Sequence, residues 1–276
     1  MLGLILGKPG KGKTLTLTDI GYRKFKKDNP PIKVWFFEKI LRKKWVYTIH
    51  CYSDYPIIFK EPKTDKEGNY IITEKTRKYK FYDENNNVRE SYTISSIPLR
   101  IFNMTIDNRL QKDSTILIDE IQTKYDSMEY KDFPDSIAHF YQIHRHLDLD
   151  IFISSQSQSR VVKRVVVLSE EYNDIVSFHK IFRWAFLKIR RTWDMSANLE
   201  NGVYNDSIAD VEYYRKVINL KKVGKLYDSK YLRHLQDDST SYPVLQFNSK
   251  TLSKEQLLYL FFPTIDEKKK LKNMRY

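Results

Sequence analysis

The chain has 276 residues, of which 41% are hydrophobic and 14% aromatic, enough for one large or two small domains with a substantial core. Its 48 Lys and Arg residues exceed its 35 Asp and Glu residues, and the formal net charge of +13 suits a partner with a phosphate backbone or an anionic membrane surface. The only cysteine, Cys51, excludes an internal disulfide framework and fits a reducing compartment. We interpret Cys51 as a packing residue, because no catalytic base lies near it in the sequence.

A glycine-rich segment lies almost at the start of the chain. Residues 7–14 fit the phosphate-binding pattern GxxxxGK[ST] at every fixed position, between a predicted buried strand over 2–6 and a predicted helix over 15–24. In this context backbone N–H groups curl around a β-phosphate, Lys13 neutralises β and γ oxygens, and Thr14 holds Mg²⁺. The predicted ATP-binding residues are Gly7, Lys8, Pro9, Gly10, Lys11, Gly12, Lys13, Thr14 and Leu15.

The long segment that follows is larger than one crossover between strands requires. Strands of the core sheet are predicted over 33–37 and 45–52. Over 60–96, alternating residues and turn residues predict inserted β-hairpins that project from the sheet, either to contact a substrate or partner or as surface decoration. A helix is predicted over 98–109.

Two carboxylates, Asp119 and Glu120, directly follow the apolar run 115–118. The carboxyl end of a strand beside a phosphate loop is where a doubly wound sheet places its metal-binding residue, so we expect Asp119 to hold Mg²⁺, through water. Glu120 is the candidate base that polarises the attacking water, which favours ATP hydrolysis over phosphoryl transfer to a small acceptor. The alternative is a strand that exits into solvent with acidic residues at its end.

A third strand is predicted over 150–155 and ends at Gln156. We expect Gln156 to face the γ-phosphate from a strand that neighbours the Asp119 strand, where its amide orients water; the alternative is a polar strand cap. The helix predicted from 134 ends near Arg145, between two histidines. Those histidines are two residues apart and share no helix face, so they do not indicate a metal site.

Together these segments resemble a known family. The sequences GKPGKGKT, TILIDE and HRHLDLDIFISSQ, with Arg160 shortly beyond, are similar to the zonular occludens toxin-like ATPases, the group that contains the filamentous-phage assembly protein. The resemblance is more distant to DNA-pumping ATPases of the HerA and FtsK type and to viral genome-packaging ATPases. It covers residues 1–168 with a gap, plus a weaker similarity at 224–229. It implies an α/β P-loop NTPase fold: a mostly parallel central sheet flanked by helices in three layers.

The resemblance also implies an ATPase that moves DNA during phage assembly, packaging or extrusion, acting as a ring-shaped homo-oligomer, with a hexamer as one possible size. Arg145 or Arg160 would then act as an arginine finger across a subunit boundary. A phage structural or membrane partner fits this role. The implied location is the host cytoplasm, with the inner-membrane surface and the virion left open. Two alternatives remain: a nucleotide-gated scaffold or switch with slow turnover, and a helicase-like replication motor.

The remaining part of the chain is less informative. Over 160–193, basic and aromatic residues interleave, which suits either a nucleic-acid surface or a β-meander with a solvated basic face. We divide the chain into an ATPase core over 1–194 and a C-terminal extension over 195–276, with a linker at 195–208 and helices at 210–220 and 229–235. Filamentous-phage relatives carry a membrane-spanning helix, but the apolar run 257–262 is too short to span a bilayer, which needs about 20 residues. We therefore expect no transmembrane segment in this chain, and a short helix from 253.

Overall fold

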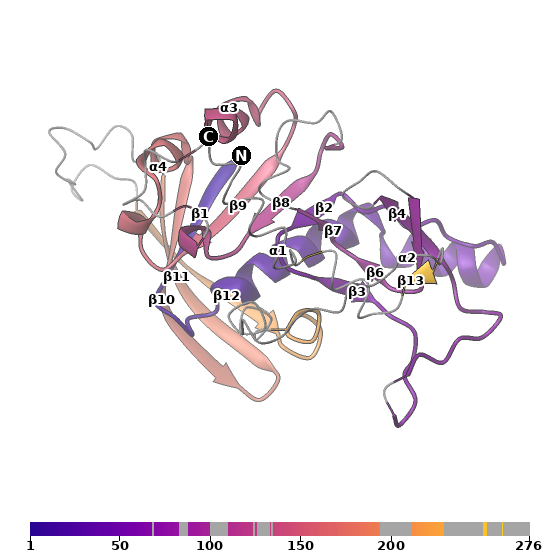
Figure 1. The fold of residues 1–276 in the computed structure, drawn as a ribbon. Helices are drawn as coiled ribbons and strands as arrows, with labels where there is room; N and C mark the ends of the chain where they lie inside the picture. Colours follow the sequence, from indigo (N-terminus) through magenta and orange to yellow (C-terminus); the bar gives the residue numbers. More distant parts are fainter. Residues whose placement is uncertain are drawn as a thin grey trace, which may run out of the picture.

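A computed structural model describes residues 1–67, 69–82, 88–99, 110–123, 125, 133, 135–193, 211–228, 251–252 and 261. Its centre is an eight-stranded sheet with the order β12-β11-β10-β1-β9-β8-β2-β7 (Figure 1). Parallel pairing runs from β10 through to β7, and β11 and β12 continue the sheet antiparallel. The strands are β1 (Leu2–Leu6), β2 (Cys51–Ser53), β7 (Ile97–Pro98), β8 (Thr115–Ile118), β9 (Asp150–Ser155), β10 (Glu171–Ile181), β11 (Trp184–Trp193) and β12 (Val211–Asn219).

Helices cover both faces of this sheet, which confirms the predicted α/β class. Helix α1 (Lys13–Asp28) packs Leu17 and Phe25 against one face, where Ile5 and Phe152 are buried. Helices α3 (Asp135–Ile143) and α4 (Lys163–Leu168) belong to the core on the other face. Because β1 contributes apolar side chains to both cores, its uninterrupted apolar sequence is what a central parallel strand requires.

The elements around the site lie where the sequence predicts them. Strand β1 is followed by the phosphate loop and then by α1, which extends four residues beyond the predicted end at 24. Strand β9 lies between β1 and β8, and it pairs with both. The ends of β1, β8 and β9 therefore meet at one edge of the sheet, since the three strands run parallel.

Of the two strands predicted before the insertion, the first is wrong and the second is right only at its end. Residues 33–37 are helical, in α2 (Pro31–Trp35) and the π-helical η1 (Phe36–Ile40). Pro31 at the first helical position favours a helix start, because its missing N–H would have no partner there. In the predicted strand 45–52 only the end is a strand, since β2 begins at Cys51. Cys51 is buried there, and burial raises the pKa of its thiol, as expected for a packing residue.

The predicted insertion does contain a hairpin. Strand β4 (Tyr79–Tyr82) pairs antiparallel with β5 (Val88–Ser91), and β13 (Thr251–Leu252) pairs parallel with β5. Strand β3 (Ile58–Lys60) pairs with β6 (Ile94–Ser95). Elsewhere in the insertion, Thr64 and Tyr70 form a single antiparallel bridge. Most of the helix predicted over 98–109 lies outside the described residues.

The helix predicted over 210–220 is wrong, because residues Val211–Asn219 form the edge strand β12. It pairs antiparallel with β11, and its side chains point alternately to the two faces of the sheet. A helix could not make this pairing. This strand extends the same sheet, although it lies beyond the proposed domain boundary at 194. The predicted linker at 195–208 and the helix at 229–235 lie outside the described residues, as does almost all of the helix from 253. Within the described part of the chain, no helix is long and apolar enough to span a bilayer.

Candidate nucleotide-binding site

The loop between β1 and α1 has the backbone that a phosphate cradle needs. Gly10 and Gly12 have φ angles of +77° and +85°, in the left-handed region that glycine enters without a Cβ penalty. A Cβ on Gly12 would lie 3.0 Å from the ring of Phe178, so this position also lacks room for a side chain. Lys8, Pro9 and Gly10 are exposed, whereas the side chain of Leu15 is buried in the core. Leu15 can therefore offer only its backbone to a phosphate.

The first turn of α1 brings its side chains to the carboxylates that follow β8. Lys13 Nζ lies 2.9 Å from Glu120 Oε1, and the lysine side chain is only 3% exposed. Thr14 Oγ1 donates a 2.8 Å hydrogen bond to Asp119 Oδ2. Residues more than a hundred positions apart in the sequence thus meet at one edge of the sheet, as the phosphate-loop and carboxylate motifs together predict.

Two residues that the sequence analysis missed hold this pair of carboxylates. Ser154, on β9, donates from its hydroxyl to Asp119 Oδ1 and accepts a 2.9 Å hydrogen bond from Glu120 N. Asp54, which follows β2, accepts from Asp119 N through both carboxylate oxygens, at 3.0 and 3.1 Å. The register could have indicated Ser154, because Ile153 pairs with Ile118 and the next residues continue side by side.

Glu120 has a backbone conformation that needs support. Its φ angle of 50° is left-handed, which costs a non-glycine residue free energy and persists where the surroundings enforce it. Besides the bond to Ser154, its side chain accepts a hydrogen bond from Gln122, and its carbonyl accepts one from Thr123. This turn directs the Glu120 carboxylate back toward Lys13, and so toward the phosphate loop.

The donor set at Asp119 fits Mg²⁺. A threonine hydroxyl and a carboxylate side by side are hard oxygen ligands, and Mg²⁺ bound to such a pair takes its remaining ligands from phosphate oxygens and water. Burial raises the pKa of the Asp119 carboxyl above its ordinary value, against the hydrogen bonds from Ser154 and Thr14, which lower it. A cation at Thr14 and Asp119 would offset that cost by favouring the ionised form. A different kind of metal site, made of three or more His, Cys, Asp or Glu side chains, is not found among the described residues.

Gln156 and Arg160 lie together at the same edge of the sheet. Gln156 directly follows β9, the strand between β1 and β8, and its Oε1 accepts a 3.2 Å hydrogen bond from Arg160 Nη1. Arg160 is exposed, in a short 3₁₀ turn. The predicted placement of Gln156 beside the Asp119 strand is therefore observed, and an exposed arginine accompanies it.

Arg145 lies elsewhere. Its Nε is 3.2 Å from Glu170 Oε1, and the same carboxylate oxygen accepts a hydrogen bond from Leu2 N at the start of β1. The phosphate loop follows the other end of β1, a strand of five residues, which separates the two ends by about 17 Å. Arg145 thus contributes nothing to the nucleotide site of its own chain.

Part of the chain matches a known protein family. Residues 73–196 match the family model of the zonular occludens toxin (Zot). This segment is Zot-like. It contains Asp119, Glu120, Gln156 and both candidate arginines, but begins after the phosphate loop. The family resemblance predicted from the motifs is thereby confirmed, while no curated protein matches the chain.

Two solved structures are also similar to the chain. The N-terminal domain of zonular occludens toxin from Neisseria meningitidis is 18% identical, with a TM-score of 0.44, over 82% of this chain and 98% of that one. The genome packaging NTPase B204 from Sulfolobus turreted icosahedral virus 2, in complex with ATP-gammaS, is 12% identical, with a TM-score of 0.27, over 66% and 76%. Both likenesses are weak, with TM-scores below 0.5.

Proposed function

We propose that this protein is an ATP-hydrolysing motor that moves DNA during phage assembly or genome packaging, as a ring-shaped homo-oligomer. The observation that carries the proposal is the convergence of Lys13 and Thr14 with Asp119 and Glu120. Lys13 would bind β and γ oxygens, Thr14 and Asp119 would hold Mg²⁺, and Mg²⁺ would neutralise charge that develops on the phosphates. Gln156 would orient water, and Arg145 or Arg160 would act on the nucleotide of a neighbouring subunit.

The ion pair between Lys13 and Glu120 has a consequence for this mechanism. In the structure, Lys13 holds one oxygen of the Glu120 carboxylate, and Gln122 holds the other. Phosphate oxygens that replace Glu120 as the partner of Lys13 would release that carboxylate, which could then accept a proton from the attacking water. Nucleotide binding and base activation would thus be coupled through one lysine.

The sheet extension supports DNA as the partner. On one face of β11 and β12, alternate residues place basic side chains beside aromatic ones, and Lys188 Nζ lies 5.1 Å from the centre of the Tyr213 ring. Such a surface suits a sugar-phosphate backbone with bases that stack. We call it the β11–β12 face, and it comprises Trp184, Phe186, Lys188, Arg190, Tyr213 and Arg215.

A nucleotide-gated scaffold or switch is the second candidate, and the same ion pair favours it. A base that stays paired with Lys13 would give slow turnover, so that ATP binding would organise partners rather than drive movement. A helicase-like replication motor would share the catalytic core and differ in unwinding a duplex.

ATP hydrolysis by Lys13→Ala and Glu120→Gln, with and without single- and double-stranded DNA, tests the proposal. We expect Lys13→Ala to lose ATP binding, and Glu120→Gln to bind ATP but hydrolyse it about 10²–10⁴-fold more slowly. The control Glu74→Gln removes an exposed carboxylate in the insertion and should leave both unchanged. If the wild-type oligomer hydrolyses no ATP, and Glu120→Gln still assembles with its partners, the scaffold replaces the motor; strand separation would instead indicate the helicase-like activity.

A further inference from the structure

Residues 30–47, which we call the arm, present an exposed apolar surface that the nucleotide site does not use. The arm contains α2 and η1 and follows the C-terminal end of α1 (Figure 1). Within it, Ile32 is 81% exposed, and Trp35 and Ile40 are each 55% exposed. Single exposed apolar residues are ordinary, but a group of large ones in one short segment marks an interaction surface. Other exposed apolar residues of the arm are Phe36, Phe37, Leu41 and Val46.

Four of the exposed apolar residues lie on one side of a helical run. Residues 31–40 are helical without a break, and Ile32, Trp35, Phe36 and Ile40 are spaced at i, i+3, i+4 and i+8. This spacing places them on one side of a helix. Phe37 lies to the other side and packs edge-on against Trp45, with ring centroids 5.2 Å apart. No residue of α2 or η1 is buried, and Lys39 lies on the same side as these four residues, so the run presents apolar and basic side chains together.

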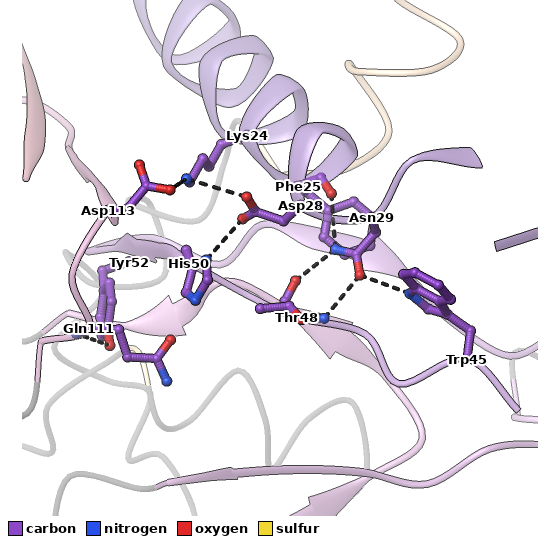
Figure 2. A network of polar contacts seen from close by, with 10 residues as sticks. All are labelled: Lys24, Phe25, Asp28, Asn29, Trp45, Thr48, His50, Tyr52, Gln111 and Asp113. Atoms are coloured by element: carbon purple, nitrogen blue, oxygen red, sulfur yellow. Dashed lines mark hydrogen bonds and ion pairs between the residues drawn. The ribbon is translucent and has the colours of Figure 1, made fainter. Parts of the chain in front are cut away.

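A polar clasp fixes the arm in this orientation (Figure 2). Asn29, at its start, accepts hydrogen bonds from Trp45 Nε1 at 3.1 Å and Thr48 N at 2.9 Å, and donates to Thr48 O at 2.7 Å. Arg77 donates to Trp45 O at 2.7 Å and pairs with Glu38 at 3.0 Å. Because both ends of the arm are joined and its middle is held by Arg77, its apolar face is presented in a defined geometry.

The charge of the arm distinguishes between possible occupants. Its basic residues are all exposed, and its one acidic residue, Glu38, is already paired with Arg77. A second copy of this surface would be repelled by like charge. A nucleic acid would suit the charges and the rings of Trp35 and Phe36, but it would leave the aliphatic side chains of Ile32, Ile40 and Leu41 in water. The basic residues are Lys33, Lys39, Arg42, Lys43 and Lys44.

We propose that the arm binds the surface of an anionic lipid bilayer. Exposed Trp, Phe, Ile and Leu side chains suit the boundary between headgroups and acyl chains, and neighbouring Lys and Arg residues suit anionic headgroups. Ile32, Trp35 and Ile40 would enter the boundary region. The phosphate loop lies at the opposite end of α1, a helix of 16 residues, about 24 Å long, so the two sites are separate. The proposal does not depend on the proposed function.

Flotation with lipid vesicles tests the proposal on the full chain. We expect wild-type protein to float with vesicles of equal parts phosphatidylcholine and phosphatidylglycerol, and much less with phosphatidylcholine alone. The double variant Trp35→Ser/Ile40→Ser should weaken binding at least ~10-fold, because two large apolar side chains no longer leave water. Lys43→Gln/Lys44→Gln should weaken binding to the anionic vesicles in proportion to the charge removed.

Matched controls separate the arm from general apolar exposure. Phe182→Ser removes a 95% exposed side chain in the turn between β10 and β11, and it should leave flotation unchanged. Trp35→Phe should retain binding. Since the replaced arm residues are exposed, all variants should unfold at the wild-type temperature. With acyl chains brominated in the hydrocarbon region, tryptophan fluorescence should be quenched in the wild type and less so in Trp35→Phe.

Three results would overturn the proposal. Equal flotation of the wild type and Trp35→Ser/Ile40→Ser would show that the arm does not bind lipid. A change in oligomeric state in that variant, with flotation unchanged, would identify a second copy of the chain as the occupant. Loss of binding to a single-stranded oligonucleotide, again with flotation unchanged, would identify a nucleic acid.

Discussion

The Ser154 hydroxyl connects the carboxylate of Asp119 to the backbone of Glu120. It donates to the Asp119 side chain and accepts from the Glu120 backbone, so it sets the direction of two residues with different roles. Groups that orient metal ligands and bases typically matter nearly as much as the residues they orient. Because Ser154 lies between the phosphate loop and the Asp119 strand, we expect it to be a positioning residue for the proposed hydrolysis.

Replacement of this serine tests that role. We expect Ser154→Ala to lower kcat for ATP hydrolysis by about 10–100-fold, since Asp119 and Glu120 lose a common partner. The matched control is Ser155→Ala, because Ser155 is also buried on β9 but donates to the carbonyl of Ser157 instead. Steady-state kinetics of both variants would contradict the assignment if the two lost activity equally.

Gly12 and Gly10 offer a second test at the residue scale. Both have left-handed φ angles, but a Cβ on Gly12 would meet Phe178 at 3.0 Å, whereas Gly10 has nothing within 4 Å. Gly10→Ala should cost about 1–2 kcal/mol of stability from the backbone alone. Gly12→Ala should cost a further ~1–3 kcal/mol, because Phe178 must move. Chemical denaturation measures the difference, and equal destabilisation of the two variants would exclude the contact with Phe178.

At the scale of elements, an ion pair ties β12 to α1. Lys216 Nζ lies 3.1 Å from Asp19 Oδ2, and Arg23 Nε lies 2.9 Å from the same oxygen. Lys216 is largely buried, so its charge depends on Asp19 for compensation. This contact fixes the edge strand over the helix that carries the phosphate-binding turn.

Lys216→Met should therefore destabilise the protein, by about 1–3 kcal/mol. The effect is limited because Arg23 still pairs with Asp19 and the methionine fills the space of the lysine stem. Urea denaturation measures the loss of stability. The control is Lys222→Met, which replaces an exposed lysine in the turn that follows β12. Equal stability of the two variants would show that the pair contributes nothing.

The pH dependence of this contact follows from its burial. Burial lowers the pKa of Lys216 from its ordinary value of 10.5, although Asp19 opposes the shift. The folded pKa is then below the unfolded one, so the unfolded chain binds more protons in the window between them. The wild type should gain stability relative to Lys216→Met as pH rises through the lowered pKa toward 10.5. A flat or falling difference would contradict the shift.

Prediction succeeded for elements whose patterns are local. The phosphate loop, α1 and the strands that end at Asp119 and Gln156 follow from runs of apolar residues and from their neighbours. The predicted strand at 33–37 and the predicted helix at 210–220 failed because both segments have mixed apolar and charged sequences that suit either structure. At 33–37 the helix start at Pro31 and the hydrogen bonds of Asn29 favour a helix. At 210–220 pairing with β11 makes the segment a strand.

At the scale of the whole molecule, part of the net charge of +13 is concentrated on two surfaces, the β11–β12 face and the arm. Basic residues of the β11–β12 face lie beside exposed aromatic rings, at the edge of the sheet formed by the antiparallel strands. The arm carries another basic group at the far end of α1. Aromatic rings accompany the basic residues of both surfaces, and the arm adds exposed aliphatic side chains, Ile32, Ile40 and Leu41, which suit a lipid boundary.

Salt dependence tests the β11–β12 face. We expect Lys188→Ala/Arg190→Ala/Arg215→Ala to weaken binding to single-stranded DNA and to reduce the slope of log K against log salt by about 0.7 for each phosphate group that the variant no longer neutralises. The control Lys63→Ala/Lys66→Ala/Lys75→Ala removes the same charge from exposed positions in the insertion. A similar slope change in both variants would mean that net charge, rather than this face, attracts DNA.

The sequence by itself identified the residues of the candidate site: the phosphate loop with Lys13 and Thr14, the carboxylates Asp119 and Glu120, and Gln156 at the end of a strand. These depend on residue type and local order, which a sequence displays directly. Only the tertiary structure decided which side chains meet. Strand register placed Ser154 and Asp54 against the carboxylates, parallel strand direction moved Arg145 to the opposite end of β1, and the clasp at Asn29 turned the apolar face of the arm outward. Each of these outcomes depends on contacts between residues distant in sequence, and no local pattern specifies such contacts.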